Sequence, residues 1–266
     1  MHTIDIKSVS NIRDLGGVKT ADGRQVAEKR LLRSGALNKL QRDDYEFLID
    51  EYHLKKVVDM RTDSESKYSP DNIDGRVQLV HIPILDKRTL GVTFDKAADM
   101  LTMLTEGSKL LKETGGTSHR YMVRNYTKFV TEDFCLKAFE SFFRLLLDTP
   151  EGAVLWHCSA GKDRAGTSAL LLLLLLGVDR ETAVNDYLYS NRCYVEFNRH
   201  MLKVLQQKGA DDFTVEQAEG FLIVKKEYID IVLSEVDRVG GIEKFAESRL
   251  HLGEQDIIRL RNMYLI

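Results

Sequence analysis

A strand-like run, a short polar loop and a long apolar run follow one another in the middle of the chain. Residues 153–156 precede the loop His157–Arg164, and residues 165–176, which include seven consecutive leucines, follow it. A strand that ends in a tight loop at a helix N-terminus is typical of α/β sheets, and it brings backbone N–H groups and the helix dipole to one point. The pattern therefore predicts a central strand, a buried helix and an anion-binding loop between them.

The loop itself combines a nucleophile with groups that bind phosphate. Cys158 stands at its start and Arg164 six residues later, where a guanidinium can hold two oxygens of a phosphate. The loop amides, the helix N-terminus and Lys162 favour the thiolate form of the cysteine, which is the reactive form. We therefore expect catalysis by Cys158 and Arg164, with His157 in support and phosphate bound by Ser159, Ala160, Gly161, Lys162, Asp163 and Arg164.

Two other interpretations of the loop explain fewer of its residues. Cys158 could be an inert buried cysteine in a core turn, but that would not explain why Gly161, Lys162 and Arg164 crowd one turn. A nucleotide-binding Walker loop is excluded, because Asp163 follows Gly161-Lys162 where that motif needs Ser or Thr. The pattern thus favours a phosphatase whose cysteine forms a thiophosphate intermediate.

The stretch His157–Arg164 resembles the active-site loop of protein-tyrosine and dual-specificity phosphatases. Its Gly-Lys-Asp-Arg ending is similar to a bacterial branch, the atypical tyrosine phosphatases that also act on phosphoserine, phosphothreonine and phosphoinositides. The resemblance covers most of the chain, least of all residues 87–120, and includes residues 11–17, 32–34, 57–61, 186–188 and 240–265. It implies a protein-tyrosine-phosphatase-like fold, with a phosphorylated protein or a phosphoinositide as substrate.

One residue departs from that family. Most members carry Thr or Ser after the loop arginine, and its hydroxyl assists departure of the thiolate from the intermediate. This chain has Ala165 there. The departure puts the rate of the second step in question, and leaves the type of reaction unchanged.

Four further residues are candidates for supporting the loop. Arg13 and Asp14 belong to a polar, glycine-rich segment, where they could form a surface ion pair in a structural turn or, as the resemblance implies, buttress the site. Asp59 and Arg61 stand at the C-terminal end of a clear strand over residues 55–61. That end is the usual ligand side of an α/β sheet, and the alternative is an ion pair that caps the strand.

The leaving group needs a proton donor, for which the sequence offers two carboxylic acids. Asp86 directly follows a predicted strand over residues 77–84, where this class of phosphatase places a mobile loop with the general acid, although the Trp-Pro-Asp form is absent. Asp163 lies inside the loop, but the neighbouring Arg164 favours its ionised form and makes it a poor donor. We prefer Asp86 as the acid and keep Asp163 as a site residue.

Composition and charge restrict the class of protein. The chain has 266 residues, 43% hydrophobic and 30% charged, as in an ordinary soluble domain. A formal net charge of −3 argues against nucleic acid as a partner, and three cysteines suit a reducing compartment. There is no Cys/His spacing typical of zinc, no signal peptide and no apolar stretch long enough to span a bilayer. These features predict a cytoplasmic protein without metal, cofactor or integral membrane segment, and they leave secretion without a recognisable signal peptide as the alternative.

Strands separated by helices, followed by a helical second half, predict the fold class. We expect an α/β fold with a central, mostly parallel sheet flanked by helices, in one domain over residues 1–266. Residues 180–207 and 220–239 are each expected to be helical. Two helices within residues 87–131 could form a helical lid over the site, the alternative being ordinary core packing.

The loop leaves three functional classes open. A phosphatase agrees with all its features. A sulfurtransferase also uses a loop cysteine at a helix N-terminus, but normally needs no arginine six residues later, so Arg164 counts against it. A phosphate-binding module with negligible turnover is favoured by Ala165 and opposed by the presence of Cys158, Arg164 and the two acid candidates.

Overall fold

The centre of the molecule is a mostly parallel sheet. The computed structural model describes residues 2–86 and 100–266. The strand order is β1-β2-β3-β6-β4-β5, in which β3, β6, β4 and β5 run parallel, while β2 is antiparallel to both of its neighbours, β1 and β3. The strands are β1 (His2–Thr3), β2 (Arg13–Asp14), β3 (Leu31–Ser34), β4 (Leu54–Asp59), β5 (Gln78–His81) and β6 (Ala153–His157). The predicted α/β class is thereby confirmed.

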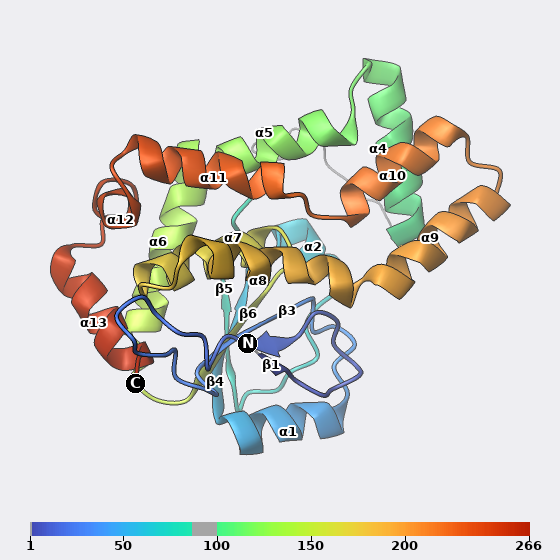
Figure 1. The fold of residues 1–266 in the computed structure, drawn as a ribbon. Helices are drawn as coiled ribbons and strands as arrows, with labels where there is room; N and C mark the ends of the chain where they lie inside the picture. The colour runs from blue at the N-terminus through green and yellow to red at the C-terminus, as the bar shows by residue number, and fades with distance from the viewer. Residues whose placement is uncertain (1, 87–99) are drawn as a thin grey trace.

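Alternation along the strands divides the apolar residues between two layers, because successive side chains point to opposite faces of a sheet. On one face Val57 and Leu155 pack in a cluster with Leu48 of α1 (Arg42–Tyr52). On the other face Val58 and Trp156 belong to a larger core that also includes α6 (Asp133–Leu147) and α7 (Arg164–Leu175). Figure 1 shows α1 alone below the sheet and most other helices above it.

The leucine-rich helix α7 is buried almost all round, as the sequence predicts. Its residues from Ala165 to Leu173 are all buried, and the indole nitrogen of Trp156 donates to the carbonyl oxygen of Ala165 at 3.1 Å. This bond joins the first turn of α7 to the strand that enters the loop. Within the described residues, none of the helices has the length and apolar character needed to cross a bilayer.

The C-terminal half is helical, and two predicted helices are broken. Residues 180–207 form α8 (Arg180–Cys193) and α9 (Val195–Gln207), which meet at Tyr194. Residues 220–239 are divided between α10 (Asp212–Leu222) and α11 (Lys226–Arg238). The second break has a physical cause, because the side chain of Asn191 donates to the carbonyl oxygen of Val224 and accepts from its N–H, each at 2.8 Å. The last helices are α12 (Ile242–Leu250) and α13 (Glu254–Tyr264).

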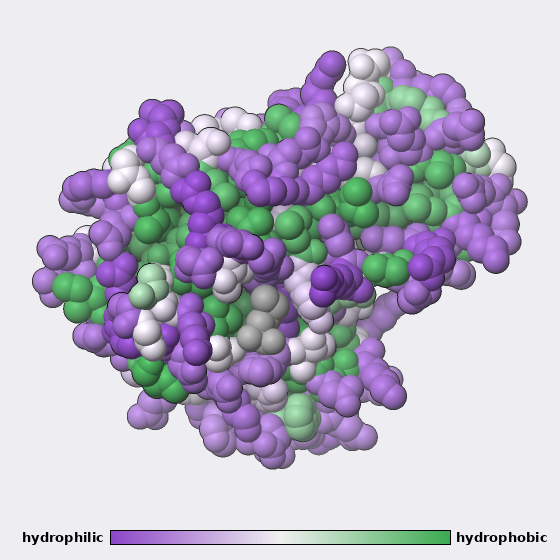
Figure 2. Space-filling view, in the orientation of Figure 1, coloured by the Kyte–Doolittle hydropathy of each residue, from purple (hydrophilic) through white to green (hydrophobic). Residues whose placement is uncertain are grey.

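The predicted lid region contains α4 (Met100–Thr114) and α5 (Ser118–Thr131), while residues 87–99 lie outside the described part of the chain. Helix α4 joins α9 and α10 in a lobe beside the main body (Figure 1), around a small apolar cluster of Leu104, Met201, Leu205, Ala218 and Leu222. Figure 2 shows that hydrophilic side chains interrupt the apolar surface of this lobe. Helix α5, by contrast, contributes Tyr126 and Phe129 to the main core. Lid closure stays a prediction.

Candidate active site

The loop that the sequence singles out lies between the end of β6 and the start of α7. His157, at the end of β6, pairs in register with Ser34 of β3 and Asp59 of β4, so the loop leaves the sheet from a central strand. Gly161 has a φ of 66°, and a Cβ there would lie 2.1 Å from the carbonyl oxygen of Ser34. Only glycine fits this position, because a side chain would meet both backbone strain and a direct clash.

Arg164 and Glu65 form a paired clamp at the far end of the loop. Nη1 and Nη2 of Arg164 donate to the two carboxylate oxygens of Glu65 at 2.6 and 2.9 Å, and Ser159 Oγ donates to the same carboxylate. Burial alone would raise the pKa of Glu65, but the Arg164 guanidinium and these hydrogen bonds hold it well below its ordinary value. In turn, although burial acts to lower the pKa of Arg164, the Glu65 carboxylate and the Cys158 sulfur raise it. Both groups therefore stay charged.

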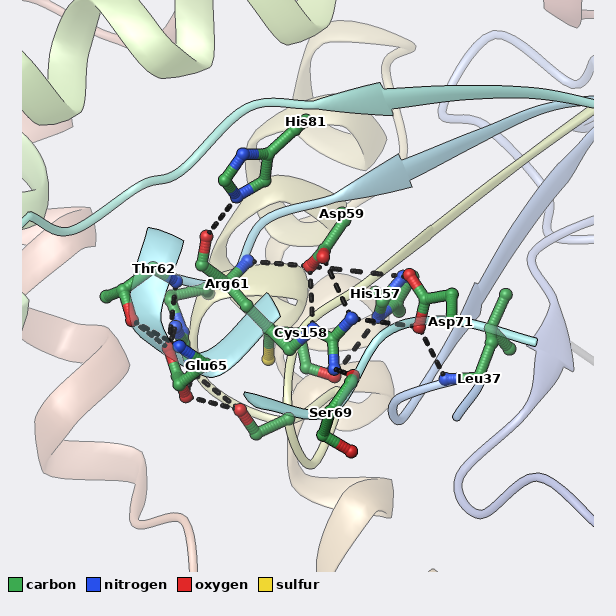
Figure 3. A network of polar contacts seen from close by, with 12 residues as sticks. Leu37, Asp59, Arg61, Thr62, Glu65, Ser69, Asp71, His81, His157 and Cys158 are labelled. Atoms are coloured by element: carbon green, nitrogen blue, oxygen red, sulfur yellow. Dashed lines mark hydrogen bonds and ion pairs between the residues drawn. The ribbon is translucent and has the colours of Figure 1, made fainter. Parts of the chain in front are cut away.

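The helix that carries Glu65 is short and begins with a capping box. Helix α2 (Asp63–Tyr68) has Thr62 at its N-cap, whose hydroxyl accepts from the N–H of Glu65, while the Glu65 carboxylate accepts from the N–H of Thr62 at 2.9 Å. Figure 3 shows this reciprocal pair. The same carboxylate thus closes the capping box and holds Arg164, which fixes its position relative to the loop.

A buried polar network supports the residue before the cysteine (Figure 3). His157 Nε2 lies 2.9 Å from Asp71 Oδ2, and its Nδ1 lies 3.3 Å from the carbonyl oxygen of Cys158. Arg61 Nε donates to Asp59 at 2.8 Å and its Nη2 donates to both Asp59 and Asp71 at 2.9 Å. Asp59 and Arg61 thus form the ion pair that was one of the two alternatives, and the pairing extends to the loop through Asp71; their support of the site stays a prediction.

The same network contains a set of potential metal ligands. Donor atoms of Asp59, Asp71 and His157 all lie within 4.8 Å of one another. However, the guanidinium of Arg61 already lies between the two carboxylates and supplies the positive charge that they need. A divalent ion there would have to displace a buried arginine, so this geometry favours an ion-pair cluster over a metal site.

Lys162 and Asp163 are bonded to each other inside the loop. Lys162 Nζ donates to Asp163 Oδ2 at 2.7 Å, and the hydroxyl of Tyr126 on α5 donates to Asp163 Oδ1 at 2.8 Å. The lysine side chain is 8% exposed and the aspartate 21%. Lys162 is therefore a largely buried, paired cation in this structure.

The predicted surface ion pair between Arg13 and Asp14 is wrong, because both residues are buried and have other partners. Arg13 Nε donates to Asp186 Oδ1 on α8 at 2.7 Å. Asp14 instead accepts from the backbone N–H groups of Gly16 and Lys29 at 2.8 and 2.7 Å. Its carboxylate therefore organises its own turn, whereas Arg13 joins β2 to the helix behind the loop.

Three side chains from outside the loop donate hydrogen bonds to its backbone carbonyl oxygens. Arg33 pairs with Asp186 and donates through Nη2 to the carbonyl oxygen of Gly161 at 2.6 Å. The amide of Asn11 and the hydroxyl of Tyr194 both donate to the carbonyl oxygen of Ala160, at 3.0 and 2.8 Å. Because these donors take up outward-facing carbonyls, the loop can direct its N–H groups to its centre.

Asp86 follows β5 and is half-buried, and its charge acts on Lys128 near the end of α5 and on Cys135 at the start of α6. Burial and the nearby Glu132 and Asp86 carboxylates raise the pKa of Cys135 to about 12, so this second cysteine remains a thiol. The proton-donor role of Asp86 stays a prediction.

Four residues that contact the loop or its supporting arginines were not predicted from the sequence as site residues: Glu65, Asp71, Tyr126 and Asp186. One of them had a sequence signal, since Thr62-Asp63-Ser64-Glu65 matches the Thr-x-x-Glu capping box. Asp186 lies in one of the segments that resemble the bacterial phosphatases. Asp71 and Tyr126 have no comparable local pattern, because their partners are distant in the sequence.

Almost the whole chain matches a protein-family model. The model of that family, described as the tyrosine phosphatase family, aligns with residues 4–266. This protein therefore belongs to the tyrosine phosphatase family, and it is accordingly a phosphatase.

Two relatives and one solved structure illustrate the similarity. A protein of Cupriavidus necator that carries the provisional name of a tyrosine-protein phosphatase is 31% identical over 99% of this chain and 89% of its own length. The triple specificity protein phosphatase PtpB of Mycobacterium tuberculosis is 26% identical over 87% of each chain. The crystal structure of a Cys-to-Ser variant of Pseudomonas aeruginosa TpbA with phosphotyrosine matches 80% of this chain and 89% of its own, with 14% identity and a TM-score of 0.32.

Proposed function

We propose that this phosphatase hydrolyses phosphomonoesters through a covalent intermediate on Cys158. One observation carries the proposal: Cys158 begins a loop at the N-terminus of α7, and Arg164 at the other end is held by Glu65. Within the described residues, Nε of Arg164 makes no hydrogen bond, so it can donate to a phosphate oxygen. The helix N-terminus adds further stabilisation of negative charge.

The reaction follows in two steps. The Cys158 thiolate attacks phosphorus, a sulfur–phosphorus bond forms, and the bond to the leaving oxygen breaks as that oxygen takes a proton. Water then attacks phosphorus, the sulfur–phosphorus bond breaks, and inorganic phosphate leaves with the thiolate restored. Arg164 and the loop amides hold the equatorial oxygens, where charge spreads in both transition states.

The general acid is proposed to be Asp86, with Asp163 as the competing candidate. Both oxygens of Asp163 accept hydrogen bonds, one from Tyr126 and one from Lys162, and this arrangement suits an ionised carboxylate. Asp86 follows β5, whose C-terminal end is on the same side of the parallel sheet as the loop. Replacement of each acid by asparagine separates the two candidates, because only loss of the true acid impairs protonation of the leaving group.

The proposed substrates are phosphotyrosine and, in addition, phosphoserine, phosphothreonine or phosphoinositides. The broader range is supported by the Gly-Lys-Asp-Arg ending of the loop and by the similarity to a relative named for triple specificity. A free Lys162 would favour multiply phosphorylated lipids, but its pairing with Asp163 reduces that support. All three cysteines are free thiols, which suits the reducing cytoplasm as the site of action.

A phosphate-binding module with negligible turnover is the second candidate, because Ala165 lacks the hydroxyl that assists thiolate departure in relatives. A sulfurtransferase explains less, since it gives no role to the Arg164–Glu65 clamp. Turnover itself distinguishes these possibilities.

The deciding experiment is hydrolysis of p-nitrophenyl phosphate by purified, reduced protein, with Cys158→Ser alongside and chelator present throughout. We expect turnover that persists in chelator and disappears in the variant, while the variant still binds tungstate. Substantial turnover by Cys158→Ser would exclude Cys158 as the nucleophile. Turnover absent from the folded wild type would favour the binding module, and thiosulfate cleavage would favour the sulfurtransferase. A panel of phosphopeptides and phosphoinositides then defines the substrate range.

A further inference from the structure

Three buried tyrosines form a cluster beside Asp163, and one of them, Tyr126, contacts its carboxylate. Tyr126 of α5, Tyr187 of α8 and Tyr228 of α11 are each fully buried, and the rings of Tyr187 and Tyr228 lie 6.2 and 5.6 Å from that of Tyr126. The Tyr126 and Tyr187 oxygens are 2.7 Å apart. Since Tyr126 donates to the carboxylate at 2.8 Å, Tyr187 donates to Tyr126, and the chain of hydrogen bonds ends on Asp163.

These hydroxyls keep their protons over the working range of a phosphatase. Burial, reinforced by the charge of Asp163, raises the pKa values of Tyr126 and Tyr187 well above the ordinary value. Tyr126 is therefore a permanent donor. It also belongs to a helix that is distant from the loop in sequence, so the contact exists only in the folded chain.

The position of Asp163 makes this contact unusual. Asp163 is the N-cap residue of α7, where an aspartate normally accepts from the N–H groups of the first helical turn. Here the side chain makes no such bond, and Tyr126 and Lys162 take both of its oxygens. The helix N-terminus therefore stays free of a bound carboxylate.

We infer that Tyr126 is a positioning residue which holds Asp163 away from the N-terminus of α7, so that this terminus remains available to the phosphate of the substrate. Without the Tyr126 hydroxyl, the carboxylate can rotate to cap the helix, and it then competes with phosphate for the same positive end of the dipole. Tyr126 thus prevents inhibition by an anion of the chain itself. This inference rests on the proposed function for its biological meaning, but its test measures anion binding.

The test is the dissociation constant of tungstate, a tetrahedral dianion, by isothermal titration calorimetry with the full chain. Tyr126→Phe should weaken tungstate binding by about tenfold, which corresponds to roughly 1.4 kcal/mol. Tyr228→Phe is the matched control, because its hydroxyl is buried in the same cluster and has no hydrogen-bond partner within the described residues. It should bind tungstate like the wild type.

A second pair of variants separates positioning from a general loss of structure. Asp163→Asn should bind tungstate at least as tightly as the wild type, and Tyr126→Phe should have no further effect in that background. Unchanged binding by Tyr126→Phe alone would overturn the inference, as would the same tenfold loss in the Asp163→Asn background. If tungstate binding behaves as expected but the wild type hydrolyses no phosphomonoester, the proposed function fails and the role of Tyr126 stands.

Discussion

The carboxylate of Glu65 accepts from both terminal nitrogens of Arg164, at 2.6 and 2.9 Å, across 99 residues of sequence. This contact uses the end of the guanidinium and leaves Nε for a phosphate oxygen. Bidentate pairs of this kind fix orientation as well as charge. The pair with Glu65 therefore orients the arginine of the loop.

Glu65→Gln is expected to impair the clamp while keeping the helix cap, since glutamine also serves in a capping box. We expect kcat/KM for p-nitrophenyl phosphate to fall by roughly 10- to 100-fold, from the loss of a charge-assisted hydrogen bond. Steady-state kinetics measure this. Glu46→Gln is the matched control, because Glu46 makes a bidentate pair with Arg76 of the same two lengths on the surface. Equal rates for both variants and the wild type would contradict the role of Glu65.

The general acid can be identified from leaving-group dependence. The true acid, replaced by asparagine, should slow hydrolysis of alkyl phosphates far more than that of p-nitrophenyl phosphate, because nitrophenolate leaves without a proton. We expect this behaviour, with loss of the basic limb of the pH–rate profile, from Asp86→Asn. If Asp163→Asn shows it instead, the two roles are reversed.

Ala165→Thr is expected to raise kcat by a few-fold, if the missing hydroxyl makes hydrolysis of the intermediate slow. Ala165 is fully buried at the start of α7, so the larger side chain itself perturbs packing. Ala165→Val controls for this, because valine has the shape of threonine without the hydroxyl. A rise in both variants, or in neither, would mean that the hydroxyl does not limit turnover; pre-steady-state burst kinetics identify the limiting step.

The Arg13–Asp186–Arg33 cluster should make stability depend on pH. Burial alone would raise the pKa of Asp186, but the two guanidinium groups outweigh burial and hold it below its ordinary value. Because the folded-state pKa is depressed, the stabilisation is complete above the unfolded pKa of about 3.9 and is lost as pH falls through the folded-state value. Urea unfolding at a series of pH values should show this loss in the wild type.

Asp186→Asn should remove that pH-dependent contribution and lower the free energy of unfolding at pH 7 by roughly 3–5 kcal/mol, because two buried arginines lose their common carboxylate. Asp237→Asn, which affects a surface pair with Arg180, should change the unfolding free energy very little. Similar costs for the two variants would show that the buried cluster is not the stabilising element inferred here.

Local sequence determined the loop and the elements beside it. The apolar run at 153–156, the turn at Gly161 and the leucine-rich helix are encoded by neighbouring residues, and the fold class follows from the alternation of strands and helices. The spacing of Cys158 and Arg164 likewise places both at the two ends of one loop. These features could be predicted because strand, turn and helix preferences act over a few residues.

The tertiary structure decided which charges support that loop. Arg13 was expected to pair with its neighbour Asp14, but its partner is Asp186, 173 residues away, and Arg164 is held by Glu65 rather than by a sequence neighbour. Asp163 accepts a hydrogen bond from Tyr126 of α5, a helix for which the sequence left both a lid and core packing open. Sequence spacing cannot show such partners, because a buried charge must be matched by whichever opposite group the packed chain brings within hydrogen-bond distance.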